Sequence, residues 1–300
     1  MFSFIDRIEQ PPDRMPTNIH PTAIVSPGAR IPASASVGPW CTVGTNVVLG
    51  EEVRLVSHVV LSGDDIGRLT VGHGTTIYPF ACLGIAPQDL KYAGEPTACT
   101  IGKHTTIREY VTISRGTEGG GGLTTVGDHC LIMAYTHIGH DSHIGNHCIL
   151  ANSATLAGHV TVEDYATVGA LCPVHQFCRI GRHSYIGGGT TITQDVLPYS
   201  LTSIERNNHA YGLNKVGLER RGFTPDQLKA LRHAYRLLQA SKLNTADALA
   251  AIRAMVGQAP ALDAPSAPGI SDVTPLDAAA AEHVRYLADF IASSDRGIIK

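Results

Sequence analysis

The sequence predicts an all-β solenoid followed by a small α-helical domain. Three observations carry this prediction: a period of six among aliphatic residues, glycines that follow many of them, and helical spacing after about Ser203. A period of six matches neither the 3.6 residues of a helix nor the two of a flat strand, so the chain must return to the same inward-facing position once in every hexad. The period runs unbroken through Val126, Ile132, Ile138, Ile144, Leu150, Leu156, Val162, Val168, Val174, Ile180, Ile186 and Ile192.

Each hexad is expected to form one short strand and one corner. Three hexads close a triangular coil, so residues eighteen apart lie above one another, and coils stack at the strand spacing of about 4.8 Å. The same period is present from Ile19 onward, and about twenty-six hexads give about nine coils. A glycine beside the inward residue suits a tight corner where a Cβ would be crowded or φ would be unusual. Examples are Val37-Gly38, Val71-Gly72, Ile144-Gly145 and Ile180-Gly181.

Two segments interrupt the period and should protrude as loops. The first lies between Leu83 and Ile101 and contains the string QDLKYAGEP, whereas the second lies between Ile113 and Val126 and contains four consecutive glycines. Loops that leave a solenoid usually carry binding groups or simply tolerate extra length. The charged and aromatic side chains of the first loop favour binding, while the glycine run leaves the two interpretations evenly balanced.

Helical signals dominate the last third of the chain. Thr224-Pro225-Asp226-Gln227 combines an N-cap, a proline at the first helical position and a capping-box glutamine. Further helices are expected near Asn244 and near Thr274-Pro275. The predicted organisation is an N-terminal extension (1–17), a solenoid (18–203) and a helical domain (204–300) with a Pro/Ala-rich insert at about 257–273.

Composition narrows the class of protein. With 300 residues, 43% hydrophobic content and a formal charge of −3, the chain can bury a large core and has no bias toward nucleic acid. It contains neither a secretory signal nor a stretch of membrane-spanning length, so we expect a cytoplasmic protein without membrane insertion. The seven cysteines contain no C-x-x-C pair and are interpreted as small buried thiols.

Titratable residues crowd together between His137 and His143. Eighteen-residue stacking places Asp141 beneath His159, and His140 beneath Gly158. A histidine beside a carboxylate and near a backbone N–H has the parts of a general base with an orienting acid and an oxyanion donor. The sequence therefore predicts a catalytic site around His140 and Asp141.

Several strings resemble one enzyme family closely. They include residues 88–97 (QDLKYAGEPT), 115–117 (RGT), 137–141 (HIGHD), 148–160 (CILANSATLAGHV), 174–177 (VHQF) and 220–223 (RRGF). In these strings the chain resembles the hexapeptide-repeat family of UDP-N-acetylglucosamine O-acyltransferases, which begins lipid A biosynthesis. The resemblance implies a left-handed parallel β-helix and a homotrimer with active sites between subunits.

The resemblance also implies a reaction and its residues. A 3-hydroxyacyl chain passes from acyl carrier protein to the glucosamine 3-hydroxyl of UDP-N-acetylglucosamine, without a metal or a separate cofactor. His140 matches the general base, Asp141 its orienting acid and Gly158 the oxyanion donor. Gly188 matches the residue that measures the acyl chain. The remaining matches are Asp89, Lys91, His137 and His159, near the sugar and the carrier arm, and His175, Gln176, Asn214, Arg220 and Arg221, near the nucleotide and carrier.

Three alternatives stay open on the sequence alone. The enzyme could act on a 3-amino analogue of the sugar, since Ser114 stands where many relatives have a larger polar residue. The spacing H-x-x-H-x-x-H also suits zinc ligands, as in the carbonic anhydrases that share the hexapeptide repeat. Finally, the repeats could form a scaffold without catalysis.

Overall fold

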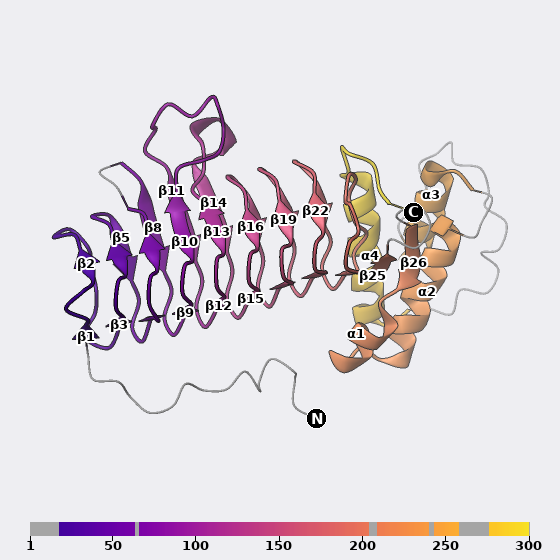
Figure 1. Ribbon diagram of the computed structural model, residues 1–300. Coiled ribbons are helices and arrows are strands. Elements are labelled where there is room, and N and C mark those ends of the chain that lie inside the picture. Colours follow the sequence, from indigo (N-terminus) through magenta and orange to yellow (C-terminus); the bar gives the residue numbers. More distant parts are fainter. Residues whose placement is uncertain (1–17, 64–65, 204–208, 240–242, 258–275, 300) are drawn as a thin grey trace.

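The computed structural model describes residues 18–63, 66–203, 209–239, 243–257 and 276–299. Short parallel strands form three sheets that make the sides of a triangular prism (Figure 1). Sheet A contains β1 (Asn18–Ile19), β3 (Ser36–Val37), β6 (Arg54–Leu55), β9 (Thr76–Ile77), β12 (Thr106–Ile107), β15 (Leu131–Ile132), β18 (Ile149–Leu150), β21 (Thr167–Val168), β24 (Tyr185–Ile186), β25 (Ser200–Ser203) and β26 (His209–Leu213).

The other two sides are sheets B and C. Sheet B contains β2 (Ile24–Val25), β4 (Thr42–Val43), β7 (Val60–Leu61), β10 (Cys82–Ile85), β13 (Thr112–Ser114), β16 (His137–Ile138), β19 (Thr155–Leu156) and β22 (Pro173–Val174). Sheet C contains β5 (Val47–Leu49), β8 (Arg68–Val71), β11 (Ala98–Ile101), β14 (Leu123–Val126), β17 (His143–Ile144), β20 (Thr161–Val162) and β23 (Arg179–Ile180). The chain visits the sheets in the order A, B, C, so the prism has an AB edge, a BC edge and a CA edge.

The hexad periodicity explains the core. Ile138 and Leu156 are fully buried, and they pair in register eighteen residues apart as predicted. Most hexads bury two side chains, the aliphatic residue and a smaller one two positions before it, such as Ala154 before Leu156. The apolar ones form one continuous cluster along the prism. All seven cysteines are free thiols, six of them buried and Cys82 half-buried, in agreement with the sequence prediction.

The predicted role of the hexad glycines is half right. A Cβ on Gly38 would lie 1.8 Å from the carbonyl oxygen of Val56 in the next coil, so crowding does require glycine there. Its φ angle, however, is not positive. The left-handed conformation falls two residues later on larger side chains, with φ of 60° at Trp40 and 57° at Asp141. Ring stacking between successive coils accompanies this conformation, as in the pair formed by His159 and Phe177.

Both interruptions of the period emerge from the BC edge. Residues 86–97 connect β10 to β11, and residues 115–122 connect β13 to β14 in the next coil, with a short 3-10 helix η2 (Glu118–Gly120). The coils resume in register after each loop, because Leu83 pairs with Ile113, and Ile101 pairs with Val126. The two loops therefore project together from neighbouring coils (Figure 1).

Among the described residues, four α-helices gather at one end of the prism (Figure 1): α1 (Lys215–Arg220), α2 (Pro225–Gln239), α3 (Thr245–Met255) and α4 (Ala278–Ala292). Thr224 and Gln227 exchange the hydrogen bonds of a capping box, and Asn244 caps α3, as predicted. The last helix starts later than predicted, with Asp277 as its N-cap, while Thr274 and Pro275 lie outside the described residues.

Three of the described elements were absent from the sequence prediction: the 3-10 helix η2, helix α1, and strand β26, which pairs antiparallel to β25. We propose residue 203 as the division between the prism and the helical domain, since the parallel order of sheet A ends at β25. The predicted N-terminal extension and residues 258–273 of the Pro/Ala-rich insert lie outside the described residues. In the part of the chain that is described, no helix has the length and apolarity needed to cross a bilayer.

Candidate active site

The titratable cluster lies at the BC edge, where both loops protrude. His140 and Asp141 connect β16 to β17, and Gly158 and His159 connect β19 to β20 in the next coil. The peptide N–H of His159 donates to the carbonyl oxygen of His140 at 2.9 Å, which confirms the predicted stacking. The loop of residues 115–122 leaves the same edge one coil earlier. Three successive coils thus contribute to one surface.

His140 and Asp141 form a hydrogen-bonded pair. The Nδ1 atom of His140 lies 2.8 Å from Oδ2 of Asp141, whose side chain is fully buried, whereas the imidazole is 15% exposed. An ionised carboxylate can only accept a hydrogen bond, so Nδ1 carries the proton and Nε2 keeps its lone pair. This tautomer is the one that a general base needs.

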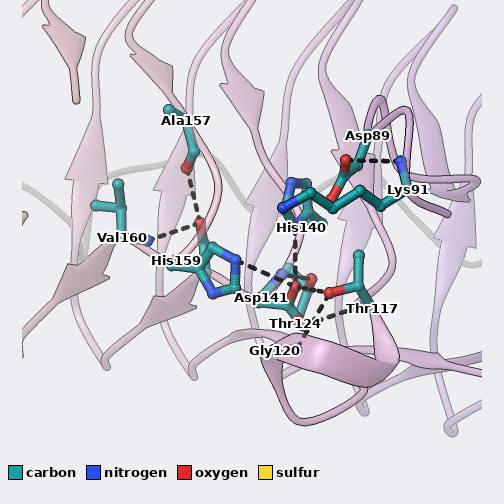
Figure 2. Close-up of polar contacts among 11 residues, drawn as sticks. Asp89, Lys91, Thr117, Gly120, Thr124, His140, Asp141, Ala157, His159 and Val160 are labelled. Atoms are coloured by element: carbon teal, nitrogen blue, oxygen red, sulfur yellow. Dashed lines mark hydrogen bonds and ion pairs between the residues drawn. The ribbon is translucent and has the colours of Figure 1, made fainter. Parts of the chain in front are cut away.

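The buried carboxylate of Asp141 is well satisfied by the glycine-containing loop. The peptide N–H of Thr117 donates to Oδ1 at 2.8 Å, and the Thr117 hydroxyl donates to Oδ2 at 2.6 Å (Figure 2). From the coil below, Thr124 Oγ1 accepts the peptide N–H of Asp141 at 2.8 Å. His159 Nε2 lies 3.8 Å from the same Oδ2 atom. The carboxyl group thus has three hydrogen-bond partners, the Thr117 N–H, the Thr117 hydroxyl and His140 Nδ1, as a buried charge requires.

The glycine run packs against this carboxylate at one position. A Cβ on Gly120 would lie 2.1 Å from Cγ of Asp141, and a Cβ on Gly116 would lie 2.8 Å from its Oδ1. A Cβ on Gly119 or Gly121 would meet nothing within 4 Å. The sequence alone did not decide the function of this glycine run. In the structure, Gly120 lets the backbone of the loop approach the Asp141 carboxylate closely, whereas Gly119 and Gly121 make no such approach.

Gly158 packs against the imidazole of His140. A Cβ at this position would lie 2.6 Å from Cε1 and 2.7 Å from Nε2 of His140. Among the described residues, the Gly158 N–H donates to no protein acceptor. A backbone donor and the free nitrogen of the candidate base are therefore neighbours, which is the arrangement that acyl transfer through a tetrahedral intermediate uses.

Two further histidines, His137 on β16 and His159 at the BC edge, stay neutral at neutral pH. Burial lowers the pKa of His137, and the nearby His140 lowers it further. Burial also lowers the pKa of His159, while the charge of Asp141 opposes this shift. His137 Nδ1 is hydrogen-bonded to Thr112 Oγ1 at 2.7 Å. Both rings are suited to polar contacts with a substrate rather than to ion pairing.

The first loop places Asp89 and Lys91 above the same edge (Figure 2). The peptide N–H of Lys91 donates to Oδ1 of Asp89 at 3.0 Å, and the negative charge of Asp89 raises the pKa of His159, against the effect of burial.

The two loops are connected by Arg115, which is 2% exposed and donates to the hydroxyl of Tyr92 at 2.7 and 3.0 Å. Arg115 was part of a recognised string in the sequence, but no function for it could be inferred there.

A groove of about 440 Å³ begins at His159 and continues toward the C-terminal segment, where Phe177, Arg179 and Arg296 line it. His175 and Gln176 are exposed in the same coil as Phe177. A guanidinium nitrogen of Arg296 lies 3.1 Å from Nδ1 of His175. Hence the candidate nucleotide-binding residues of this edge lie beside a groove that is lined by two arginines and two aspartates, Asp195 and Asp295.

The remaining candidates lie on other edges of the prism. Asn214 and Arg221 lie at the CA edge, where Asn214 Nδ2 donates to the carbonyl oxygen of His183 at 3.1 Å, and the guanidinium of Arg221 lies 5.3 Å from the ring centre of Tyr165. Arg220 is exposed at the end of α1. Gly188 follows β24 at the AB edge, where a Cβ would lie 3.2 Å from the carbonyl oxygen of Ala170. A single chain therefore does not bring these residues together with His140.

Comparison with known proteins identifies close relatives. The acyl-[acyl-carrier-protein]–UDP-N-acetylglucosamine O-acyltransferase of Thermodesulfovibrio yellowstonii is 47% identical over 282 residues, which cover 94% of this chain and 99% of that protein. The family profile described as UDP N-acetylglucosamine O-acyltransferase, domain 2, matches residues 195–299, and the profile of the bacterial transferase hexapeptide (six repeats) matches residues 123–158.

Solved structures agree with this assignment. The UDP-N-acetylglucosamine acyltransferase of Francisella novicida superposes with a TM-score of 0.82 at 35% identity, covering 93% of each chain. The corresponding enzyme of Moraxella catarrhalis gives a TM-score of 0.80 at 38% identity, covering 94% of this chain and 99% of that one. These likenesses confirm the predicted left-handed parallel β-helix with a small helical domain. The chain therefore belongs to the UDP-N-acetylglucosamine O-acyltransferase family.

Proposed function

We propose that this enzyme transfers a 3-hydroxyacyl chain from acyl carrier protein to the glucosamine 3-hydroxyl of UDP-N-acetylglucosamine, with His140 as the general base. The observation that carries the proposal is the His140–Asp141 pair at 2.8 Å, with the Gly158 peptide against the imidazole. This transfer is the first step of lipid A biosynthesis.

The reaction follows from the proton positions. His140 Nε2 accepts the proton of the sugar 3-hydroxyl while that oxygen attacks the thioester carbonyl. Asp141 stabilises the imidazolium that forms, and the Gly158 N–H stabilises the negative charge on the carbonyl oxygen. When the tetrahedral intermediate collapses, the C–S bond breaks, and the departing thiolate of the carrier arm takes the proton from His140. An oxyanion donor of this kind contributes about 3 kcal/mol, or roughly a hundredfold in rate.

We further propose a homotrimer whose active sites lie between subunits. The support is the distribution of candidate residues over three edges of the prism, with His140 on the BC edge, Arg221 on the CA edge and Gly188 on the AB edge. A threefold arrangement of parallel prisms would bring an edge of one chain against a different edge of its neighbour. A cytoplasmic location is proposed with it, as expected from the sequence.

The zinc alternative has one observation in its favour. One ligand atom each from His140, Asp141 and His159 lies within 4.8 Å of the others. However, Asp141 Oδ2 already accepts the Thr117 hydroxyl and the His140 Nδ1–H, so its lone pairs are engaged. The relatives named above are acyltransferases, which favours the acyl-transfer proposal.

The decisive experiment is a mass spectrum of the product made by the purified, EDTA-treated protein. The substrates are UDP-N-acetylglucosamine, its 3-amino analogue and a mixed pool of 3-hydroxyacyl carrier-protein thioesters. We expect the N-acetylglucosamine nucleotide to gain one 3-hydroxyacyl group. His140→Ala should abolish this, whereas His129→Ala, an exposed histidine at the CA edge, should not. Product from the 3-amino sugar alone would change the substrate assignment, and turnover only after zinc is restored would overturn the proposal.

A further inference from the structure

We propose that Thr117 is a positioning residue, which acts through Asp141 to hold the catalytic imidazole in its reactive orientation. Neither the motif analysis nor the proposed reaction gives this threonine a function. It lies on the loop of residues 115–122 and is 8% exposed, at the base of the glycine run. The inference rests on the proposed function of His140, and it assigns a purpose to the second loop.

The first argument concerns the direction of the hydroxyl proton. Oγ1 of Thr117 accepts the peptide N–H of Gly120 at 3.2 Å, so its own proton points away from that group. Its other neighbour is Oδ2 of Asp141, at 2.6 Å, the distance of a charge-assisted O–H···O hydrogen bond. The hydroxyl is therefore oriented as a donor to the same oxygen that accepts the proton of His140 Nδ1.

The second argument concerns rotation of the carboxyl group. An aspartate can turn freely about its Cβ–Cγ bond unless both oxygens are held. Thr117 holds both, with its peptide N–H on Oδ1 at 2.8 Å and its hydroxyl on Oδ2. With the plane of the carboxyl group fixed in this way, Oδ2 remains directed at His140, and the imidazole keeps the tautomer that leaves Nε2 as the base.

The third argument is that the loop itself is anchored. The peptide N–H of Gly116 donates to the carbonyl oxygen of Ala98 at 3.1 Å, and that of Gly122 donates to the carbonyl oxygen of Thr117 at 2.7 Å. Arg115 connects the start of this loop to Tyr92 of the first loop. A donor on an anchored loop can hold a catalytic side chain, whereas a donor on a floppy bulge could not.

The test compares Thr117→Val, which removes the hydroxyl but keeps the shape and the peptide N–H, with Thr117→Ser, which keeps both donors. The matched control is Thr105→Val at the CA edge. Its buried hydroxyl likewise donates to a neighbouring acceptor, Gly127 O at 2.9 Å with a longer contact to Lys103 O at 3.4 Å, and accepts a hydrogen bond from Cys130 N. We expect Thr117→Val to lower kcat by between tenfold and a hundredfold at unchanged KM for both substrates. Thr117→Ser should return kcat to within about threefold of the wild type, and Thr105→Val should affect stability alone.

A double-mutant cycle separates positioning from a general structural effect. In an Asp141→Asn background, measured on its residual turnover, adding Thr117→Val should cost less than twofold, because the group that it holds has already been changed. Equal losses from Thr117→Val in both backgrounds, or a loss equal to that of Thr105→Val, would overturn the inference. If the valine variant does not fold, Thr117→Ala removes the same hydroxyl. A wild type that forms no product would refute the proposed function, whereas an active wild type with an equally active valine variant would refute only this inference.

Discussion

Gly120→Ala tests the site through packing alone, because it adds one methyl group and removes no polar group. The new Cβ would lie 2.1 Å from Cγ and 2.2 Å from Oδ2 of Asp141. Ordinary contact begins near 3.4 Å, so either the carboxyl group or the loop must move by about 1.3 Å, the difference between 3.4 and 2.1 Å. The carboxyl group is held on both oxygens and is hydrogen-bonded to His140, so the displacement reaches the proposed base.

A displacement of about 1 Å at a catalytic group typically costs roughly a hundredfold in rate. We therefore expect kcat to fall about a hundredfold, which corresponds to about 2.7 kcal/mol of transition-state stabilisation. The assay is product formation at saturating concentrations of both substrates, with circular dichroism to verify folding. Gly119→Ala is the control, since its Cβ would meet nothing within 4 Å in the same 3-10 helix. A folded Gly120→Ala enzyme as active as Gly119→Ala would refute this reasoning.

Three other predictions follow from the structure. Gly158→Ala should lower kcat about a hundredfold or more, since its Cβ would lie 2.7 Å from Nε2 of His140; normal turnover in a folded variant would contradict the arrangement of the site. Burial and two neighbouring guanidinium groups lower the pKa of His183 to about 3. Below about pH 6.5 the unfolded state therefore binds a proton at His183 that the folded state does not bind. As a result, the free energy of unfolding decreases as the pH falls from 6.5 toward 3. His183→Phe should reduce this loss of unfolding free energy between pH 6.5 and 4.5 by up to about 2.7 kcal/mol. Phenylalanine is compatible with the left-handed φ at this position, since Phe177 adopts it at another corner. Urea titrations in which the unfolding free energies of the variant and the wild type depend equally on pH would contradict this. Gly188→Met should shift the preferred 3-hydroxyacyl chain to a shorter one, because its larger side chain would take up space at the position proposed to measure the acyl chain. Competition assays read by mass spectrometry test this, and an unchanged preference would show that Gly188 does not measure the chain.

Much of the fold could be predicted because each hexad is recognisable from six consecutive residues, and because three hexads together fix which residues stack in successive coils. Once Ile138 and Leu156 occupy inward positions, the eighteen-residue repeat places Asp141 beneath His159 without any further information. The capping box at Thr224 was readable for the same reason, since its signal lies within four residues. Helix α1 and strand β26 follow neither pattern, and their formation depends on packing against the end of the prism.

The candidate site was predictable only where the six-residue period is unbroken. His140 and Asp141 lie within unbroken hexads, whereas Thr117 lies inside an interruption, where sequence distance no longer indicates height along the prism. The same limit hid the packing of Gly120 on the carboxylate and the link from Arg115 to Tyr92. The unexpected φ angles have another cause: the sequence showed a glycine at each crowded position, but the turn itself is completed two residues later, as at Asp141.

The return to register after each loop has a consequence for how this architecture can change. Because Leu83 still pairs with Ile113 across twelve inserted residues, the prism is insensitive to the length of what leaves its edge. Lengthening such a loop adds only a slowly growing closure entropy, about 0.6 kcal/mol for each doubling. The BC edge therefore tolerates insertions: segments can be added, exchanged or shortened there while the coils above and below keep their structure. An ancestral prism could thus have acquired new chemistry by insertion, and a designer could vary substrate recognition by the same route.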